Sequence, residues 1–151
     1  AIFNRSHYED IIAVRVKKIF PDPVWKRRYK HVLDFESMLA EEGTVIIKLF
    51  LNISKAEQKK RLESRLQDPD KLWKFCMDDL DDRNRWDEFQ TAYQDLIEKT
   101  STPEAPWYII PADRKWYRNL VVARLMVEKL RHLQLSLPTP NFDPASIIIP
   151  D

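Results

Sequence analysis

Hydrophobic positions along the chain follow two spacings, and these spacings predict its elements. Residues 6–19 and 22–42 place apolar side chains three and four positions apart, as one face of a helix does. The run TVIIKLFLNI at 44–53 is almost continuously apolar and rich in β-branched residues, which is typical of a strand covered on both faces in a parallel sheet. A shorter run at 105–112 predicts a last strand, and residues 1–3 the end of a buried one.

Two of the predicted strands are followed by the same helix-starting pattern. Ser6 and Glu9 follow the first strand, and Ser54 and Glu57 follow the strand at 44–53. Both pairs have the S-x-x-E spacing of a capping box, in which the serine side chain accepts a hydrogen bond from the first helical turn. Strands that lead directly into helices predict an α/β fold built from βα units around a parallel sheet.

The other helices have defined ends as well. Gly43 is placed to end the helix at 22–42. Acidic residues open a long helix at 77–100, where the helix dipole favours them. Asp113 suits the N-cap of a last helix that runs to about residue 133. The residues that this helix is expected to turn inward are Tyr117, Leu120, Val121, Ala123, Val127 and Leu130.

The helix predicted at 55–67 differs from the others because its apolar stripe is thin. That stripe holds little more than Ala56, Leu62 and Leu66, whereas lysine and arginine occupy much of the rest of the helix. A proline follows Asp68 and ends the helix, because the residue before proline disfavours helical geometry. A weakly anchored basic segment suits a lid that closes over a charged substrate, and we expect this lid to span about residues 55–85.

Composition narrows the class of protein. Hydrophobic residues are 44% and charged residues 32%, which is the balance of a soluble globular domain, and no apolar run approaches a membrane span. A formal charge of +1 gives no bulk attraction to nucleic acid. Cys76 is the only cysteine and no signal peptide is visible, so a reducing cytoplasm is expected.

Glycine is informative because it is scarce. Average usage would give about ten glycines in a chain of this length, but Gly43 is the only one. A loop that cradles phosphate needs several glycines, so that backbone N–H groups can close on the anion. The chain therefore contains no such loop.

Polar residues at strand ends are the first candidates for chemistry. Asn4 and Arg5 follow the strand predicted at 1–3, and ligands of open α/β sheets bind outside the carboxyl ends of strands. Arg114 lies at another strand end, where a helix N-terminus attracts anions. The structural alternatives are an Arg5 that pairs with a nearby carboxylate and an Asp113 that only caps its helix.

The basic helix supplies the second set of candidates. Arg61 and Arg65 are four positions apart, so both guanidinium groups lie on one face, where such planar groups bind phosphate oxygens through two hydrogen bonds. Lys74 lies beyond them between two aromatic residues. The alternative is a solvated helix face with a local ion pair between Glu57 and Arg61. The three histidines are too scattered to suggest a zinc site.

The last residues, 135–151, contain four of the ten prolines and three consecutive isoleucines. This composition predicts an extended proline-rich tail. Its isoleucines are expected to pack against this domain or a neighbouring subunit, so we expect a homo-oligomer.

The motifs, taken in order, resemble a known family. The resemblance is carried by IFNRSHYED, KLFLNISKAEQKKRLESRLQDPDKLWKF and WDEFQTAYQDLIEKTSTPEAPWYIIPADRKWYRN, and it runs from residue 1 to about 133. These segments are similar to the family-2 polyphosphate kinases, which are P-loop phosphotransferases related in fold to thymidylate kinase. The resemblance implies a P-loop kinase-like parallel sheet with flanking helices and a helical lid. It also implies that residues 1–134 are the carboxyl-terminal portion of a kinase domain, incomplete at the N-terminus, where the family's Walker A loop normally lies.

Members of that family are understood to move a phosphoryl group between inorganic polyphosphate and a nucleoside mono- or diphosphate, using magnesium. The implied partners are therefore polyphosphate and AMP, ADP, ATP or the guanine equivalents, with Mg²⁺ as cofactor and with neither nucleic acid nor membrane. Without the upstream P-loop, the chain as printed is expected to be inactive.

Particular residues match the family's motifs. Asn4, Arg5 and Ser6 match the Walker B segment, where many members have aspartate in place of Asn4. An asparagine there implies a contact with Mg²⁺ through water rather than directly. Arg5 and Arg65 match arginines that hold the transferring phosphates. The residues expected to contact substrate phosphates are Asn4, Arg61, Lys74 and Arg114.

Two other functions remain open at this point. An ATP-dependent nucleoside monophosphate kinase would have the same fold class and differ in the phosphoryl donor. A natural chain without a P-loop would instead be a non-catalytic binding or assembly module.

Overall fold

The computed structural model describes residues 1–150, and helices make up most of it. The elements in chain order are α1 (Glu9–Val16), α2 (Asp22–Glu41), β1 (Lys48–Asn52), α3 (Lys55–Gln67), a 3-10 helix (Pro69–Lys74), α4 (Asp78–Asn84), α5 (Trp86–Thr100), β2 (Trp107–Pro111), α6 (Lys115–His132) and a short 3-10 turn (Pro144–Ser146).

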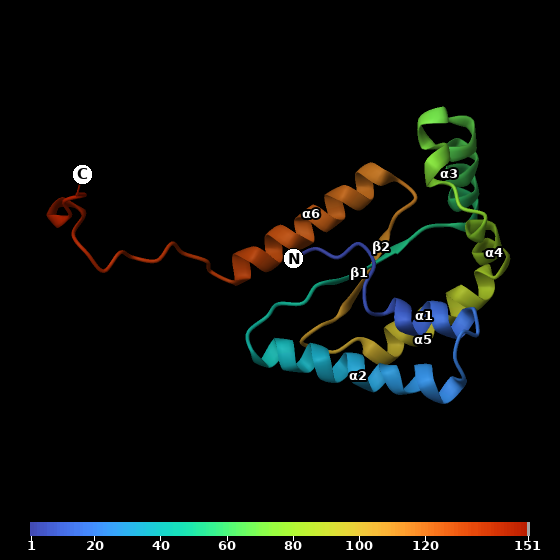
Figure 1. Ribbon diagram of the computed structural model, residues 1–151, viewed down its shortest axis with the longest axis horizontal. Coiled ribbons are helices and arrows are strands. Elements are labelled where there is room, and N and C mark those ends of the chain that lie inside the picture. The colour runs from blue at the N-terminus through green and yellow to red at the C-terminus, as the bar shows by residue number, and fades with distance from the viewer. Residues whose placement is uncertain (151) are drawn as a thin grey trace.

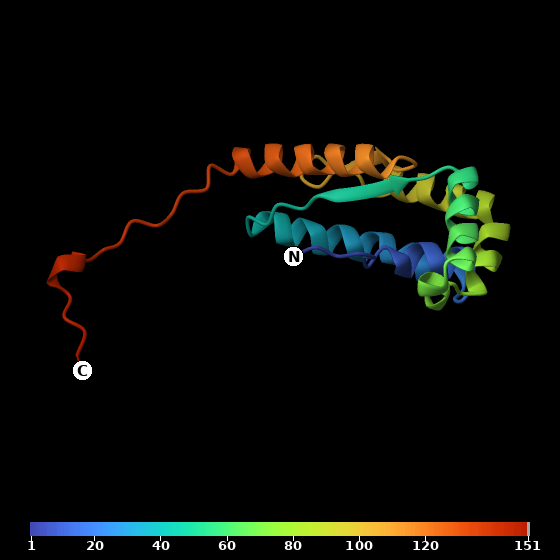
Figure 2. The same ribbon diagram turned by 90° about the horizontal axis from the view of Figure 1, so that it is seen from above.

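The two strands form a parallel sheet, which confirms the predicted α/β class. β1 pairs with β2 from Lys48 opposite Trp107 to Asn52 opposite Pro111. The sheet lies between layers of helix, with α6 on one side and α1 and α2 on the other (Figure 1 and Figure 2). β1 is shorter than the apolar run at 44–53, because strand geometry persists only where β2 supplies hydrogen-bond partners.

The hydrophobic core lies where α1 packs against α2 and α5. α1 supplies four buried side chains from only eight residues. The buried core residues of these three helices are Ile11, Ile12, Val14, Val16, Trp25, Val32, Ala92 and Leu96. Each large apolar side chain buried in this way contributes about 1.5–3 kcal/mol. The core therefore places α1, and with it the chain that leads into α1.

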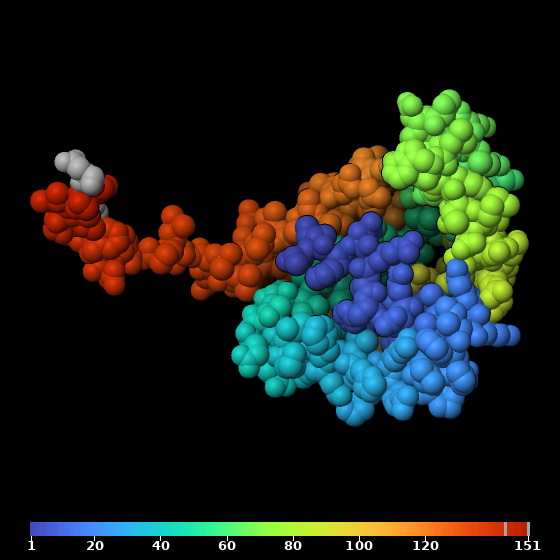
Figure 3. Space-filling model, in the orientation of Figure 1, coloured from blue at the N-terminus to red at the C-terminus, as the bar shows by residue number. Residues whose placement is uncertain are grey.

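The amino-terminal residues form no strand, so the prediction of a buried strand at 1–3 is wrong. Ile2 is 87% exposed and Phe3 is 80% exposed. Within residues 1–150 the strand pairing joins only β1 and β2, so this segment has no neighbour with which to form ladder hydrogen bonds. Figure 3 shows these first residues on the surface, across the front of the molecule between α2 and α6.

The two serines predicted to cap helices behave differently. Ser54 caps α3, because its Oγ accepts a hydrogen bond from the Glu57 N–H at 3.1 Å. Ser6 does not cap α1, which begins three residues later after Tyr8. The Ser6 carbonyl instead accepts the Glu9 N–H at 3.0 Å, and its Oγ lies 3.4 Å from the Tyr8 nitrogen. Ser6 thus lies in a turn before the helix, and the predicted cap is wrong.

Gly43 ends α2 as predicted. Its φ of +81° is the left-handed conformation that glycine adopts without strain. The N–H groups of Gly43 and Thr44 donate to the carbonyls of Ala40 and Leu39 at 3.0 and 2.9 Å. This pair of hydrogen bonds is the Schellman motif, which satisfies the last carbonyls of the helix.

Two other helices differ from their predictions. The stretch at 77–100 forms two helices, α4 and α5, because the chain bends at Arg85, whose side chain donates to the Val16 carbonyl at 3.0 Å. The last helix buries none of its residues, so the predicted inward face of α6 is wrong. Among the described elements α6 packs mainly on β2, and a two-stranded sheet is too narrow to cover an 18-residue helix.

Beyond α6 the chain runs away from the rest of the molecule (Figure 1). Its apolar side chains are exposed, including Leu137 at 93% and Ile148 at 90%. Among the helices of residues 1–150, none combines the length and the apolarity needed to cross a bilayer.

Candidate functional site

The carboxyl ends of β1 and β2 lie side by side, because the strands are parallel and in register. The Ala112 N–H donates to the Asn52 carbonyl at 2.8 Å and extends the pairing by one residue. A cleft of about 280 Å³ opens here between β1, α4 and α5, and Asp79 and Trp86 contribute to its lining. A second, more open cleft of about 450 Å³ lies beside it, between Ser54 and the end of β2.

Asp113 joins the two strand ends. Its carboxylate accepts the Ser54 N–H at 2.7 Å, and this hydrogen bond lowers the pKa of the Asp113 carboxyl. The N-cap of α6 is Arg114, which makes no side-chain cap. The prediction that Asp113 caps the last helix is therefore wrong, because the parallel strands bring the start of α3 within reach of its carboxylate.

Arg61 anchors the first turns of α3 to the end of β2. Its Nε donates to Glu57 at 2.7 Å, which is the local ion pair considered from the sequence. Its Nη2 also donates to the carbonyls of Ala112 and Asp113 at 2.7 and 3.2 Å. Two nitrogens of this guanidinium, Nε and Nη2, thus donate to the protein itself.

Arg65 lies one turn further along α3 and is held more loosely. Its Nη1 lies 3.3 Å from the Asp79 carboxylate, with the two side chains 38% and 39% exposed. Exposed pairs of this kind contribute only about 0–1 kcal/mol. A phosphate group could therefore replace Asp79 as the partner of Arg65 at little cost in free energy.

Arg5 has an unusual backbone and an open side chain. Its φ is +93°, a conformation that non-glycine residues rarely adopt. Its Nη1 lies 3.6 Å from Glu9, and the Arg5 side chain is 81% exposed. Arg5 thus pairs with a nearby carboxylate, which is the structural alternative considered from the sequence. Asn4 is exposed beside it.

The structure gathers some of the predicted residues and separates others. Arg61 and Arg65 share α3, next to the end of β2. Lys74 lies at the end of the 3-10 helix, with its Nζ 4.9 Å from the centre of the exposed Trp73 ring. Arg114 lies at the start of α6. No ion pair or hydrogen bond within residues 1–150 links Arg5 to any of them.

Sequence reasoning missed a buried polar network. Lys48 and Glu36 are 6% and 4% exposed, and their charged groups lie 2.7 Å apart. The Lys48 ammonium also donates to the Tyr8 hydroxyl at 3.1 Å and to the Thr100 carbonyl at 2.6 Å. Nε2 of the half-exposed His7 lies 3.5 Å from Glu36. The one sequence signal was a lone lysine within the apolar run at 44–53.

Burial changes the proton affinities in this network. It lowers the pKa of the Lys48 ammonium, although the neighbouring Glu36 carboxylate opposes the shift. Burial, and then the hydrogen bond to Glu36, raise the pKa of the Tyr8 hydroxyl far above its ordinary value. Tyr8 therefore stays neutral and acts as a hydrogen-bond donor to Glu36, at 2.7 Å.

Comparison with known proteins then places the chain. The model of the family described as Polyphosphate kinase 2 (PPK2) matches residues 1–137. The chain belongs to the polyphosphate kinase 2 family. This confirms the resemblance found in the sequence motifs.

Two named relatives and one solved structure of the polyphosphate kinase 2 family are similar to the chain over most of its length. An AMP/ADP-polyphosphate phosphotransferase from Meiothermus ruber is 53% identical over 148 residues, covering 98% of this chain and 55% of the relative. An ADP-polyphosphate phosphotransferase from Rhodopseudomonas palustris is 37% identical, covering 91% of this chain and 52% of the relative. The crystal structure of polyphosphate kinase 2 from Arthrobacter aurescens matches with a TM-score of 0.90 and 48% identity, covering 95% of this chain and 51% of that one. The chain spans about half the length of these three relatives.

Proposed function

We propose that the chain contributes to an enzyme that transfers a phosphoryl group between inorganic polyphosphate and a nucleoside mono- or diphosphate. The observation that carries this proposal is the family match over residues 1–137. Relatives named AMP/ADP-polyphosphate and ADP-polyphosphate phosphotransferase support it. Because the chain spans about half of their length, the proposal concerns the reaction to which these residues contribute.

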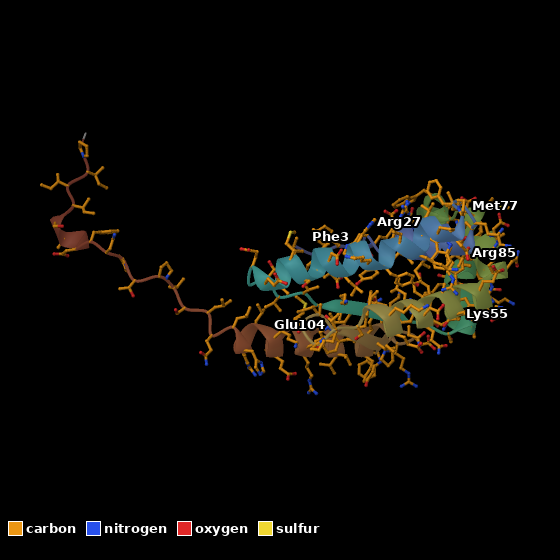
Figure 4. All side chains as sticks on the ribbon, turned by 90° about the horizontal axis from the view of Figure 1, so that it is seen from below. Phe3, Arg27, Lys55, Met77, Arg85 and Glu104 are labelled. Carbon is orange, nitrogen blue, oxygen red and sulfur yellow. The ribbon has the colours of Figure 1, made fainter. Side chains whose placement is uncertain are left out.

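The proposed fold is P-loop kinase-like, with a helical lid at about residues 55–85. The parallel strands, their polar carboxyl edge and the helices on both sides of the sheet support this fold. Within the proposed lid only Leu62 is buried in a helix, and Lys55, Met77 and Arg85 lie together at one end of the molecule (Figure 4). Few buried contacts suit a segment that opens and closes.

The arginines are proposed to neutralise phosphate charge. Phosphoryl transfer depends on positioning and on stabilising the charge of the transferring group, so the protein need supply no covalent chemistry. Arg5 and Arg65 are assigned to the transferring phosphates, since the guanidinium of Arg5 is exposed, that of Arg65 is partly exposed, and both form ion pairs that a phosphate could replace. The residues assigned to other substrate phosphates are Asn4, Arg61, Lys74 and Arg114.

Mg²⁺ is the proposed cofactor, in a site formed mostly by substrate. Magnesium keeps several water ligands and commonly binds one or two protein oxygens together with substrate phosphates. No group of three or more His, Cys, Asp or Glu side chains within residues 1–150 could hold a metal ion. The exposed Asn4 amide oxygen fits a contact through water. When bound, Mg²⁺ would neutralise phosphate charge, and the chain's own residues would orient the phosphates.

We also propose a cytoplasmic, homo-oligomeric protein that binds neither nucleic acid nor membranes. The single cysteine supports a reducing cytoplasm. The formal charge of +1 gives no bulk attraction to nucleic acid. The exposed apolar side chains of α6 support self-association.

The test is a nucleotide assay on two proteins. One is the chain as printed, and the other is a chimaera in which the chain replaces the matching 148 residues of the Meiothermus ruber relative. Each receives AMP or ADP with Mg²⁺ and either polyphosphate or ATP as the donor. We expect the chimaera to phosphorylate the nucleotide from polyphosphate. We expect no turnover from the printed chain, because its one glycine cannot form a phosphate-cradling loop.

The other outcomes separate the competing functions. Transfer from ATP to AMP, without transfer from polyphosphate, would identify a nucleoside monophosphate kinase that uses ATP. Polyphosphate binding without turnover in either protein would identify a non-catalytic module. The unsubstituted Meiothermus ruber protein serves as the positive control.

A further inference from the structure

The buried polar network connects the core to the residue before α1. Lys48 Nζ donates to Glu36 Oε2 at 2.7 Å and to the Tyr8 hydroxyl at 3.1 Å. The Tyr8 hydroxyl donates to the other Glu36 oxygen, Oε1, at 2.7 Å. These three hydrogen bonds close a triangle between β1, α2 and Tyr8, which lies at the beginning of α1.

The groups that surround the network, Thr100 and Trp107, are held by further contacts. Lys48 Nζ donates to the Thr100 carbonyl at 2.6 Å, and the Thr100 hydroxyl donates to the Leu96 carbonyl at 2.6 Å. Trp107 Nε1 donates to the Thr100 hydroxyl oxygen at 2.8 Å, and the Trp107 ring packs edge-on against the Tyr8 ring at 5.0 Å. The end of α5 and the start of β2 therefore hold Lys48 and Tyr8 from the side.

Stability alone gives no reason to keep charges in this place. Glu36 and Lys48 are almost fully buried, and apolar residues of similar volume can often replace a buried ion pair without loss of stability. A satisfied network of buried hydrogen bonds instead specifies geometry, because only one arrangement serves all of its groups. In this molecule the group held in that arrangement is the Tyr8 side chain.

A tight turn at Ser6 connects Tyr8 to Arg5. The Tyr8 nitrogen lies 3.4 Å from Ser6 Oγ, and the Ser6 carbonyl accepts the Glu9 N–H at 3.0 Å. Arg5 immediately precedes this turn with its φ of +93°. A non-glycine residue keeps such a conformation only when its surroundings impose it. On the carboxyl side of Arg5, Tyr8 is the nearest residue in sequence whose side chain is buried.

We propose that Tyr8, Glu36 and Lys48 form a positioning unit for Arg5. The network holds the Tyr8 side chain, Tyr8 sets the turn at Ser6, and the turn aims the Arg5 guanidinium. The three residues are buried away from substrate and act only through Arg5. This inference rests on the proposed function, because that function assigns Arg5 to the transferring phosphate.

The test is a double-mutant cycle in the chimaera between Tyr8→Phe and Arg5→Ala. Tyr8→Phe keeps the ring that packs on Trp107 and removes only the hydroxyl. We expect it to lower kcat at least about fivefold with little change in the KM for polyphosphate. In the Arg5→Ala background we expect no further loss, because effects transmitted through one residue are not additive.

Two further proteins separate positioning from stability. Tyr29→Phe is the matched control, since the Tyr29 hydroxyl is buried with no hydrogen-bond partner among the described residues. It makes the same chemical change and should leave kcat unchanged. Glu36→Leu combined with Lys48→Met removes the charges but keeps a buried, apolar core. We expect this protein to fold, with a urea midpoint below that of the wild type because the Tyr8 hydroxyl and the Thr100 carbonyl lose their buried partners, and to lose kcat as Tyr8→Phe does.

Two results would overturn the proposal. One is an equal loss of kcat from Tyr8→Phe in the presence and absence of Arg5. The other is full kcat in a folded Glu36→Leu, Lys48→Met protein. Failure of the unsubstituted chimaera to use polyphosphate is a different result: it would reject the proposed function, and the assignment of Arg5 with it.

Discussion

Arg61 and Arg65 are one helical turn apart, and both are assigned to phosphates, but their surroundings give Arg61 a structural task as well. Arg61 donates to Glu57 and to two backbone carbonyls, so it fastens α3 to the end of β2. Arg65 has a single, half-exposed carboxylate partner, Asp79. The spacing that placed both on one face was correct, but spacing says nothing about which acceptors lie nearby.

We expect Arg65→Ala and Arg61→Ala to separate these tasks in the chimaera. Arg65→Ala should lower polyphosphate-dependent turnover at least about tenfold, because a group that stabilises transition-state charge is lost. Its free energy of unfolding should change by less than about 0.5 kcal/mol. Arg61→Ala should lower the free energy of unfolding by about 1 kcal/mol, because the partly buried Glu57 carboxylate and Ala112 carbonyl lose their donor.

Steady-state kinetics and urea unfolding of both variants check this prediction. Wild-type turnover in Arg65→Ala would remove Arg65 from the site. Unchanged stability in Arg61→Ala would show that the anchor to β2 contributes nothing.

Asp113 makes stability depend on pH in the acid range. The Ser54 N–H lowers the pKa of this carboxyl in the folded protein below its unfolded value of about 3.9. The hydrogen bond therefore stabilises the fold fully above that unfolded value, and the contribution is lost as the pH falls through the lower, folded-state pKa. We expect the urea midpoint to fall more steeply below about pH 4 in the wild type than in Asp113→Asn. Parallel pH profiles for the two proteins would contradict this.

At the scale of elements, the same local pattern had two outcomes. Ser54 and Glu57 form the predicted cap at α3, whereas Ser6 lies in the turn before α1. The difference arises because Tyr8 is fixed by Glu36, 28 residues away, and this contact decides where α1 begins. A capping pattern predicts a helix start only when no tertiary contact moves that start.

The two serines offer a matched pair of substitutions. We expect Ser54→Ala to lower the free energy of unfolding by about 1 kcal/mol, since the Glu57 N–H loses its acceptor. Ser6→Ala should cost much less, because its Oγ makes only a long contact at 3.4 Å. Hydrogen exchange in the first turns of α3 and α1, together with urea unfolding, measures both effects. Equal costs would mean that Ser6 caps α1 in solution.

At the scale of the whole molecule, α6 leaves apolar side chains exposed along its length. Leu120, Val127 and Leu130 are 43%, 46% and 51% exposed. Several exposed apolar side chains on one helix suit an interaction surface. The packing of α6 mainly on a narrow sheet, rather than any feature of its own sequence, leaves this face open.

We expect the chain to self-associate through this face. Sedimentation velocity should show oligomers of the wild type and a shift toward monomer in Leu120→Glu with Leu130→Glu, because two charges cannot be buried unpaired in an apolar contact. Leu137→Glu, in the exposed tail, is the control and should leave the distribution unchanged. A shift in the control alone would assign the association to the tail instead.

Most of the fold class and part of the site could be predicted from local patterns. Gly43 ended its helix as predicted, the two strands paired in parallel, and the poorly anchored basic segment has few buried residues. The predictions that failed concern partners: the strand at 1–3 has none within the described residues, and Asp113 bonds to Ser54 rather than to its own helix.

The sequence by itself determined most helix positions, the order of β1, α3, β2 and α6, and the family motifs, because these depend on residues within a few positions of one another. Only the tertiary structure decided which charges meet. Lys48 is the one charged residue in the apolar run at 44–53. The fold brings Glu36, Tyr8 and the Thr100 carbonyl to it from 12, 40 and 52 residues away. Contacts at those separations depend on how helices pack around the sheet, and no local spacing encodes them.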